Sequence, residues 1–430
     1  MAASLAEPRS APNARSIAAK VVERVLVDDA FVAAALDAEL KRHPQLEPRE
    51  RALATELAYG TMRTEPALRA RLFVHAPRGV SDERVLSQLL VAAYQILLLE
   101  RVPAFAAVDA AVTGVKRERG PRVAGFANAV LRKLARTGEK LTSAQALRES
   151  VPDWLWQSLR AAVGEEEALA LVCADAYTGL RPRLGAELPD WLAELPPGRV
   201  VSSARLVRGE GDPRQRPGYA EGAFTVQEEG AQAIGLALGA QPGERVLDAC
   251  AGRGQKSTLV AERLERGHLV ACDLYPEKLA ALDTEAQRLN LPPIETRGVD
   301  WSVGAGGLSA DFDRVLVDAP CSGTGTLRRR PEILRRLGPS DPARLAALSE
   351  SILRSAASRA KPGGAVLLAV CSVLREECED VVARVTDILE PALLFASELP
   401  PELVAGKTSL RLLPGSHGTD GYFMASFRRR

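Results

Sequence analysis

The second half of the chain alternates short apolar runs with helical stretches, and this pattern constrains the fold more than any other feature. The apolar runs occupy residues 245–248, 269–272, 314–317 and 365–370, and the helical stretches fall at about 255–266, 276–289, 342–360 and 376–388. Buried strands that alternate with helices form a parallel, doubly wound sheet with helices on both faces. The sequence therefore predicts an α/β domain over residues 226–430.

The region before residue 140 has a different pattern. Apolar residues such as Ile17, Val21 and Val25 recur at helical spacing, and residues 86–98 are apolar on most faces. Gly120-Pro121 is typical of the end of a helix. We predict an all-helical bundle over residues 1–140, and a linker with a small α/β subdomain over residues 141–225.

Length and charge bound the function only loosely. The 430 residues suffice for two or three domains, and residues 1–140 carry 22 Lys and Arg against 16 Asp and Glu. This excess indicates a polyanionic partner about as well as it indicates an ordinary solvated surface. The longest apolar stretch, residues 89–99, is too short to span a bilayer, and we expect a cytoplasmic protein.

The chain has six cysteines, and their spacing matches neither a zinc site nor a disulfide framework. They stand at positions 173, 250, 272, 321, 371 and 378. We therefore expect no metal and a reducing compartment. Cys321 and Cys371 follow predicted strands, whereas Cys250, Cys272 and Cys378 are expected to be inert buried thiols.

A glycine-containing loop, DACAGRGQK at residues 248–256, joins the first predicted strand to a helix. Glycines let a ligand approach the backbone, and the helix N-terminus offers unpaired N–H groups. Asp273, 21 residues after Gly252, is placed to bind ribose hydroxyls. A dinucleotide is one candidate ligand, but the third glycine is missing. With Asp248 in the loop, an amino-acid-bearing nucleoside such as S-adenosylmethionine suits the site better. A simple tight turn is the alternative.

Five polar residues fall at the ends of predicted strands: Asp248, Asp273, Asp300, Asp318 and Cys371. Open α/β sheets bind ligands at the carboxyl ends of their strands. These residues therefore predict one functional site along that edge of the sheet.

Several motifs together resemble a known family. DACAGRGQKS (248–257), DAPCSGTG (318–325), AVCSV (369–373) and DGYFMA (420–425) resemble the NOL1/NOP2/Sun family of RNA cytosine-carbon-5 methyltransferases. The stretches ELAYGTMR (56–63), AAYQIL (92–97) and FANAVLR (126–132) resemble the NusB-like RNA-binding domain. This fusion is typical of the RsmB (Fmu/Sun) branch, whose members methylate bacterial small-subunit ribosomal RNA, usually at cytosine 967.

The resemblance spans most of the chain and implies a multidomain fold. The expected fold is an all-α NusB-like helical bundle followed by an α/β Rossmann-like class I methyltransferase domain with a mostly parallel seven-stranded sheet. The expected reaction transfers a methyl group from S-adenosylmethionine to carbon-5 of a cytosine in 16S ribosomal RNA. A monomer that needs no protein partner and no membrane is expected.

The resemblance also implies roles for individual residues. Cys371 matches the nucleophile that adds to carbon-6 of the base and makes carbon-5 reactive, and Cys321 matches the cysteine that assists breakdown of the adduct. In DNA cytosine methyltransferases the Pro-Cys motif attacks, which alone would favour Cys321. Asp318 is expected near ring N3. The expected cofactor contacts are Cys250, Ala251, Gly252, Arg253, Gly254, Gln255, Lys256, Asp273, Asp300 and Asp318.

The cofactor loop departs from the family pattern Cys-Ala-Ala-Pro-Gly-Gly-Lys-Thr. The proline position holds Arg253 and the second glycine position holds Gln255, whereas Gly254 and Lys256 are kept. Because Gly252 restores backbone freedom nearby, we expect cofactor binding to persist.

Two alternatives to a ribosomal RNA methyltransferase stay open. One is a transfer RNA methyltransferase of the same family. The other is a non-catalytic RNA-binding assembly or antitermination factor, against which the intact cysteines speak. The arginines at 328–330, 335 and 336 are predicted to bind RNA phosphates, with a solvated helix face as the alternative.

Overall fold

A computed structural model describes residues 12–209, 211–395 and 398–430. Within it the chain forms two compact units, residues 1–153 with 330–336, and residues 154–329 with 337–430. The short segment 330–336 belongs to the first unit by its contacts, although it interrupts the second in sequence. The division predicted above, with boundaries at 140 and 225, stays a prediction.

The first unit is helical throughout its described residues. Its helices are α1 (Ala14–Val27), α2 (Val32–Arg42), α3 (Pro48–Arg63), α4 (Glu65–His75), α5 (Glu83–Leu98), α6 (Ala104–Arg136), α7 (Ser143–Ser150) and α14 (Ile333–Arg336). Helix α5 is buried from Val85 to Leu97 and packs against α1, α3, α4 and α6. An apolar helix of this kind has to lie in the centre of a bundle, and the predicted helical bundle is confirmed.

Helix α6 contains a sharp kink. Gly120 has a φ of 81° and a ψ of 175°, and Pro121 follows it. This backbone conformation is open to glycine at little steric cost, and the proline removes a helical hydrogen bond. The kink therefore separates two helices at the position where the sequence predicts a helix end.

The segment 330–336 is held by arginine hydrogen bonds. A guanidinium N–H of Arg335 donates to the carbonyl oxygen of Leu26 (3.1 Å), and one of Arg336 donates to that of Ala30 (3.1 Å). These contacts use only part of the donors of each guanidinium group, and Arg335 is exposed, so the prediction that these two arginines bind RNA phosphates stays a prediction.

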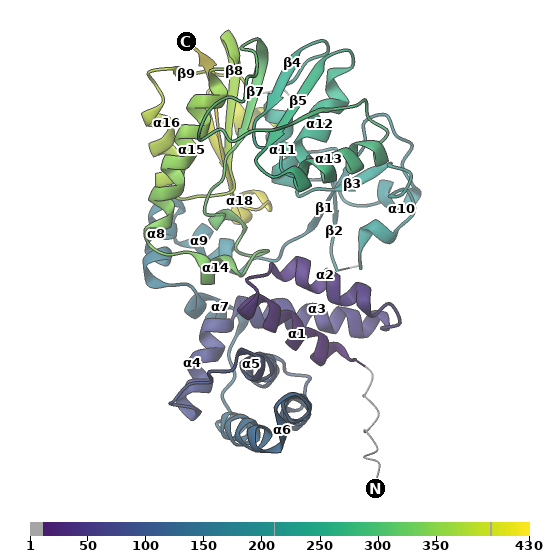
Figure 1. The fold of residues 1–430 in the computed structure, drawn as a ribbon, viewed down its shortest axis with the longest axis vertical. Helices are drawn as coiled ribbons and strands as arrows, with labels where there is room; N and C mark the ends of the chain where they lie inside the picture. Colours follow the sequence, from purple (N-terminus) through teal and green to yellow (C-terminus); the bar gives the residue numbers. More distant parts are fainter. Residues whose placement is uncertain (1–11, 210, 396–397) are drawn as a thin grey trace. The chain divides into compact units, whose positions relative to one another are not determined.

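The second unit is built on a mostly parallel sheet (Figure 1). Its strands are β4 (Arg245–Asp248), β5 (His268–Asp273), β6 (Glu295–Gly298), β7 (Phe312–Asp318), β8 (Ala360–Val370), β10 (Ser409–Leu412) and β11 (Tyr422–Arg429). Their order is β10-β11-β8-β7-β4-β5-β6, and β9 (Leu389–Pro391) adds an eighth strand beside β11. Only the pairs made by β11 are antiparallel. The predicted methyltransferase-type sheet of seven strands is confirmed.

Both faces of the sheet are covered by helices. Val246 of β4 packs into a cluster with α11 (Glu229–Ala237), α12 (Gln255–Leu264) and α13 (Pro276–Arg288). Its neighbour Leu247 faces the opposite cluster, with α15 (Asp341–Ala357) and α16 (Glu379–Arg384). Because successive side chains of a strand point to opposite faces, the strands read as continuous apolar runs.

Smaller elements complete the second unit. They are α8 (Asp153–Val163), α9 (Glu165–Cys173), β1 (Thr178–Pro182), α10 (Asp190–Ala193), β2 (Arg205–Val207), η1 (Pro213–Gln215), β3 (Phe224–Val226), η2 (Thr324–Thr326), η3 (Arg375–Glu377), α17 (Pro401–Val404) and α18 (Pro414–His417). Strands β2, β1 and β3 form an antiparallel sheet of their own. A buried ion pair between Arg181 of β1 and Glu262 of α12 (2.8 Å) ties this sheet to the larger one.

A buried carboxylate joins the Cys321 loop to the start of β11. Asp420 accepts from Nε of Arg328 at 2.6 Å and from Nε of Arg329 at 2.7 Å. The side chain of Arg328 is 1% exposed, so it cannot meet an RNA phosphate. The prediction that Arg328 binds RNA is wrong, and its charge is neutralised within the protein.

No helix in the part of the chain that the structure describes has both the length and the apolar character needed to cross a bilayer.

We predict that Asp420→Ala lowers the free energy of unfolding by about 3–5 kcal/mol, because it leaves the charge of Arg328 buried and unpaired. Urea titration followed by circular dichroism measures this loss. The control is Asp387→Ala, which removes an exposed partner of Arg354 and should change the unfolding midpoint little. Equal midpoints for the two variants would contradict the assignment.

Candidate active site at the carboxyl ends of the strands

The strand order reverses between β4 and β7. Strands β5 and β6 lie on one side of β4, while β7 and β8 lie on the other. Such a switch point opens a crevice at the carboxyl ends of the two central strands. Asp248 ends β4 and Asp318 ends β7, so both acids lie in the strands that border this crevice.

The loop after β4 has a backbone that only glycines adopt easily. Gly252 and Gly254 have φ values of 57° and 82°. A Cβ at Gly254 would lie 2.4 Å from the Leu282 side chain, whereas one at Gly252 would meet no atom within 4 Å. Gly254 is thus needed for packing against α13, and Gly252 lies in a stretch of backbone that faces open space. Both conditions suit a ligand that approaches the loop at Gly252.

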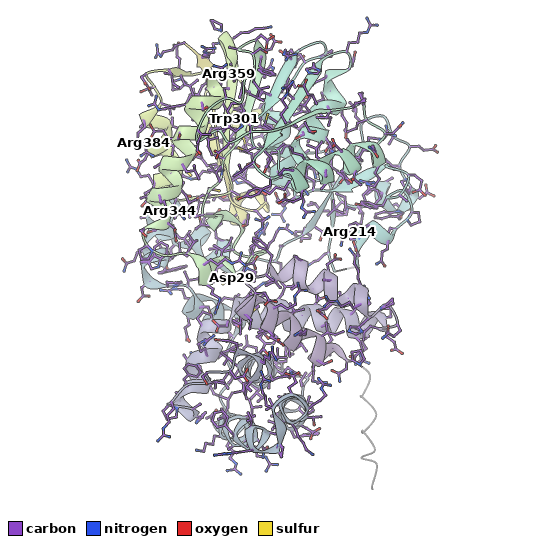
Figure 2. All side chains as sticks on the ribbon, viewed as in Figure 1. Asp29, Arg214, Trp301, Arg344, Arg359 and Arg384 are labelled. Carbon is purple, nitrogen blue, oxygen red and sulfur yellow. The ribbon has the colours of Figure 1, made fainter. Side chains whose placement is uncertain are left out.

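Neighbouring strands hold this loop in place. The Ala251 N–H donates to the Cys272 carbonyl oxygen (2.8 Å), next to the end of β5. The indole N–H of Trp301, labelled in Figure 2, donates to the Ala249 carbonyl oxygen (2.7 Å). The loop is therefore fixed by the fold before any ligand binds.

Asp273 hydrogen-bonds to the loop after β4, whereas Asp300 bonds only within its own turn, and the predicted contact of either residue with a cofactor stays a prediction. Asp273 accepts from the Gly252 N–H through Oδ2 and from the Tyr275 N–H through Oδ1, both at 2.9 Å. Asp300 follows β6 and accepts from the Ser302 N–H (3.0 Å). Strand pairing brings the two chain segments together, but no hydrogen bond joins their carboxylates to a common partner in the described chain.

The two positions that depart from the family pattern differ in their contacts. Arg253 is exposed on the loop. The Gln255 side chain donates to the carbonyl oxygen of Val226 at the end of β3 (3.1 Å). Gln255 therefore links the loop to the small sheet, which a glycine at this position could not do. Burial raises the pKa of the Cys250 thiol well above its usual value, as expected of an inert thiol.

Asp248 is buried at the start of the loop and hydrogen-bonds to α12. It is 1% exposed, and its Oδ2 accepts from the Ser257 hydroxyl at 2.7 Å, while Oδ1 has no hydrogen-bond partner. Burial raises the pKa of Asp248 to about 7, and the nearby Asp318 adds to this rise. Asp248 therefore shapes the start of α12 rather than facing the crevice.

Lys256, in the first turn of α12, pairs with Asp318. Its Nζ lies 2.6 Å from Asp318 Oδ2. Burial alone would lower the pKa of Lys256, but the Asp318 carboxylate outweighs burial and holds this pKa above its ordinary value. A charged lysine is thus fixed at the end of β7, paired with one oxygen of the Asp318 carboxylate.

The two predicted cysteines meet at this end of the sheet. Cys321 follows β7 and Cys371 follows β8, and their Sγ atoms lie 3.4 Å apart. The hydrogen bond to Cys371, together with burial, raises the pKa of the Cys321 thiol well above its usual value. A neutral Cys321 can donate its proton in a hydrogen bond and stabilise a thiolate on Cys371.

Backbone contacts hold the two thiol loops against each other. The Gly325 N–H donates to the Cys371 carbonyl oxygen (2.9 Å), and the Gly421 N–H donates to the Gly325 carbonyl oxygen (2.8 Å). A Cβ at Gly325 would lie 1.9 Å from the Gly421 carbonyl oxygen. The glycine is required by this close approach of three chain segments.

Sequence reasoning missed a set of buried polar residues under the thiols. Ser322, Thr324, Ser372 and Glu377 form one hydrogen-bonded cluster. A signal for these residues was present in the sequence, because the dipeptide Cys-Ser occurs at 321–322 and again at 371–372.

The described residues contain no group of three or more His, Cys, Asp or Glu side chains placed to hold a metal ion.

Two family models and several full-length relatives match this chain. Residues 235–428 match the family described as 16S rRNA methyltransferase RsmB/F, and residues 12–136 match the NusB family. A probable ribosomal RNA small subunit methyltransferase B of Bacillus subtilis is 31% identical over 447 residues, covering 97% of this chain and 99% of the relative. A ribosomal RNA small subunit methyltransferase B of Pseudomonas syringae is 32% identical over 441 residues, covering 96% of each chain.

The fold recurs in a solved structure. The crystal structure of PH0851 superposes with a TM-score of 0.82 at 21% identity, covering 97% of this chain and 99% of the other. At this identity the likeness supports the fold alone.

Asp248 generates a prediction about pH. Its pKa of about 7 exceeds the value of an unfolded chain, so the folded protein binds more protons between about pH 4 and pH 7 and loses stability as pH rises through this window. Across this window the free energy of unfolding of the wild type should fall by an amount on the order of 4 kcal/mol, and Asp248→Asn should remove this fall. Urea titrations across this range measure it. Asp109→Asn, at an exposed position of α6, should keep the wild-type slope, and an unchanged slope in Asp248→Asn would contradict the assignment.

Proposed function

Because the chain belongs to the RsmB/F family of 16S ribosomal RNA methyltransferases, we propose that it methylates carbon-5 of a cytosine in 16S ribosomal RNA. The observation that carries this proposal is the pair of thiols 3.4 Å apart at the ends of β7 and β8. The target proposed from the family branch is cytosine 967. A cytoplasmic monomer that acts on RNA without a protein partner is part of the proposal.

The proposed cofactor is S-adenosylmethionine, which when bound supplies the methyl group that carbon-5 accepts. The residues fit such a group, because the loop backbone at Gly252 faces open space at the N-terminus of the ten-residue helix α12. We assign the amino-acid end of the cofactor to loop 250–256 and the ribose to Asp273, with Asp300 and Asp318 nearby.

Cys371 is the proposed nucleophile. Its Sγ forms a bond to carbon-6 of the cytosine, and the π electrons of the 5,6 double bond shift toward carbon-4 and N3, which leaves an enamine that is nucleophilic at carbon-5. The hydrogen bond from Cys321 supports the thiolate that this step needs. The Lys256 ammonium, held beside Asp318, stabilises the negative charge that develops near ring N3.

Cys321 is the proposed release group. After carbon-5 is methylated, its remaining proton leaves to a base, the bond from Cys371 Sγ to carbon-6 breaks, and the thiolate is regenerated. The position of Cys321 beside Cys371 Sγ supports a role in this elimination. The two cysteines therefore act one after the other on the same cytosine.

The alternative substrate within this chemistry is transfer RNA. The names of the two relatives refer to the small ribosomal subunit and favour ribosomal RNA. A non-catalytic assembly factor would have no use for the thiol pair, nor for a lysine fixed beside Asp318.

We predict that the full-length protein incorporates label from S-adenosylmethionine into protein-free 16S ribosomal RNA at one cytosine, which bisulfite sequencing places at 967. Assembled small subunits and transfer RNA are tested in parallel. Methylation of transfer RNA alone would move the assignment to the alternative. Failure to bind the cofactor and to methylate any of the three would contradict an enzymatic role.

Cysteine substitutions separate the two thiol roles. Cys371→Ala should lower the methylation rate by about 10³-fold or more and form no covalent RNA adduct, because the nucleophile is gone. Cys321→Ala should accumulate an RNA adduct that survives denaturing electrophoresis. Cys173→Ala, in α9, is the control and should behave as wild type. A covalent RNA adduct in Cys371→Ala, together with none in Cys321→Ala, would show that Cys321 is the nucleophile and Cys371 the release group.

A further inference from the structure

Beneath the two thiols lies a buried polar cluster that the proposed chemistry does not use. We call Ser322, Thr324, Ser372 and Glu377 the Glu377 cluster. Thr324, Ser372 and Glu377 are 0% exposed and Ser322 is 7% exposed. The two serines directly follow Cys321 and Cys371, so the cluster touches both thiol loops one residue beyond the sulfur atoms.

Glu377 receives donors from both loops. Its Oε1 accepts from the Ser322 N–H at 2.6 Å. Its Oε2 accepts from the hydroxyls of Ser322 and Ser372, each at 2.5 Å. One carboxylate therefore connects the residue after Cys321 with the residue after Cys371.

The hydroxyl protons of the cluster can be followed from one oxygen to the next. When Ser372 donates its single hydroxyl proton to Glu377, Thr324 donates in the 3.0 Å contact between the Thr324 and Ser372 oxygens. Backbone N–H groups of Val373 and Leu374 donate to Thr324 and Ser372 in turn. In this arrangement the hydroxyl protons of Ser322 and Ser372 point to Glu377, and the hydroxyl proton of Thr324 points to Ser372.

Burial of the Glu377 carboxyl group in this position costs folding free energy. No lysine, arginine or histidine lies within ion-pair distance of Glu377 among the described residues, and burial raises its pKa while the serine donors lower it. An apolar side chain would fill the space at lower cost. What Glu377 provides in return is a set of three directed bonds, and these end on the two catalytic loops.

We propose that Glu377 is a positioning residue that sets the separation of the two thiols. By holding Ser322 and Ser372 on one carboxyl group, it keeps Cys321 Sγ within hydrogen-bond distance of Cys371 Sγ. The attack on the cytosine and the release of the product then occur at one site without rearrangement of either loop. This role rests on the proposed function for its chemical meaning.

Thiol cross-linking tests the geometry without RNA or methyl transfer. Dibromobimane becomes fluorescent when it bridges two thiols, and peptide mapping identifies the bridged pair. In the full-length protein, Glu377→Gln should slow bridging of Cys321 to Cys371 by about tenfold, since small displacements of reacting groups have effects of this size or more. Glu376→Gln is the matched control, because Glu376 is the exposed neighbour in η3 and should bridge at the wild-type rate.

Kinetics distinguish positioning from a general structural role. Glu377→Gln should lower kcat by about tenfold or more while leaving KM for S-adenosylmethionine unchanged. Ser372→Ala acts through the same bond, so the double variant should be no slower than Glu377→Gln alone. Full additivity of the two effects would overturn the proposal.

The outcomes separate the positioning role from the proposed function. If Glu377→Gln bridges the two thiols more slowly but the wild-type protein methylates no RNA, the positioning role is supported and only the proposed methyltransferase function is contradicted. Bridging and kcat in Glu377→Gln equal to those of Glu376→Gln overturn the positioning role. Thermal melting and cofactor binding confirm folding, and if Glu377→Gln does not fold, the bridging rate of Ser372→Ala, which removes one hydroxyl, decides the question.

Discussion

The parallel pairing of β7 with β8 determines the geometry on which the rest of the site depends. In this register Asp318 lies opposite Ala369, and the Ala319 N–H donates to the Ala369 carbonyl oxygen (2.9 Å). Cys371 and Cys321 therefore leave the sheet at the same edge and at nearly the same height. A shift of one residue would turn the side chains of β8 to the opposite faces and separate the thiols.

The sequence was informative where a short segment determines its own environment. The buried strands could be predicted because burial on both faces requires an unbroken apolar run, as in 314–317. Strand β10 was missed, since its alternating buried and half-buried residues give a weaker pattern at the end of the sheet. The strand-end acids and thiols were found because parallel topology alone places them together.

Pairings between distant segments could not be predicted. Arg328 looked like a phosphate ligand because its partner Asp420 lies 92 residues away in the chain. Glu377 lies in the stretch 376–388 that the sequence predicts as helical, and only the folded structure brings it to Ser322, 55 residues earlier. Local composition carries no information about such contacts. A charged side chain whose partner lies in a distant segment of the same chain is therefore easily interpreted as facing solvent or a ligand.

The segment 330–336 also limits how this protein can be divided. Ile333 and Leu334 in this segment are 8% and 9% exposed, and the segment groups with residues far upstream of it in the chain. A polypeptide that ends at residue 153 would lack α14 and the hydrogen bonds from Arg335 and Arg336 to Leu26 and Ala30. A cut at the sequence boundary between the two units would therefore divide the contacts of the first unit between two fragments.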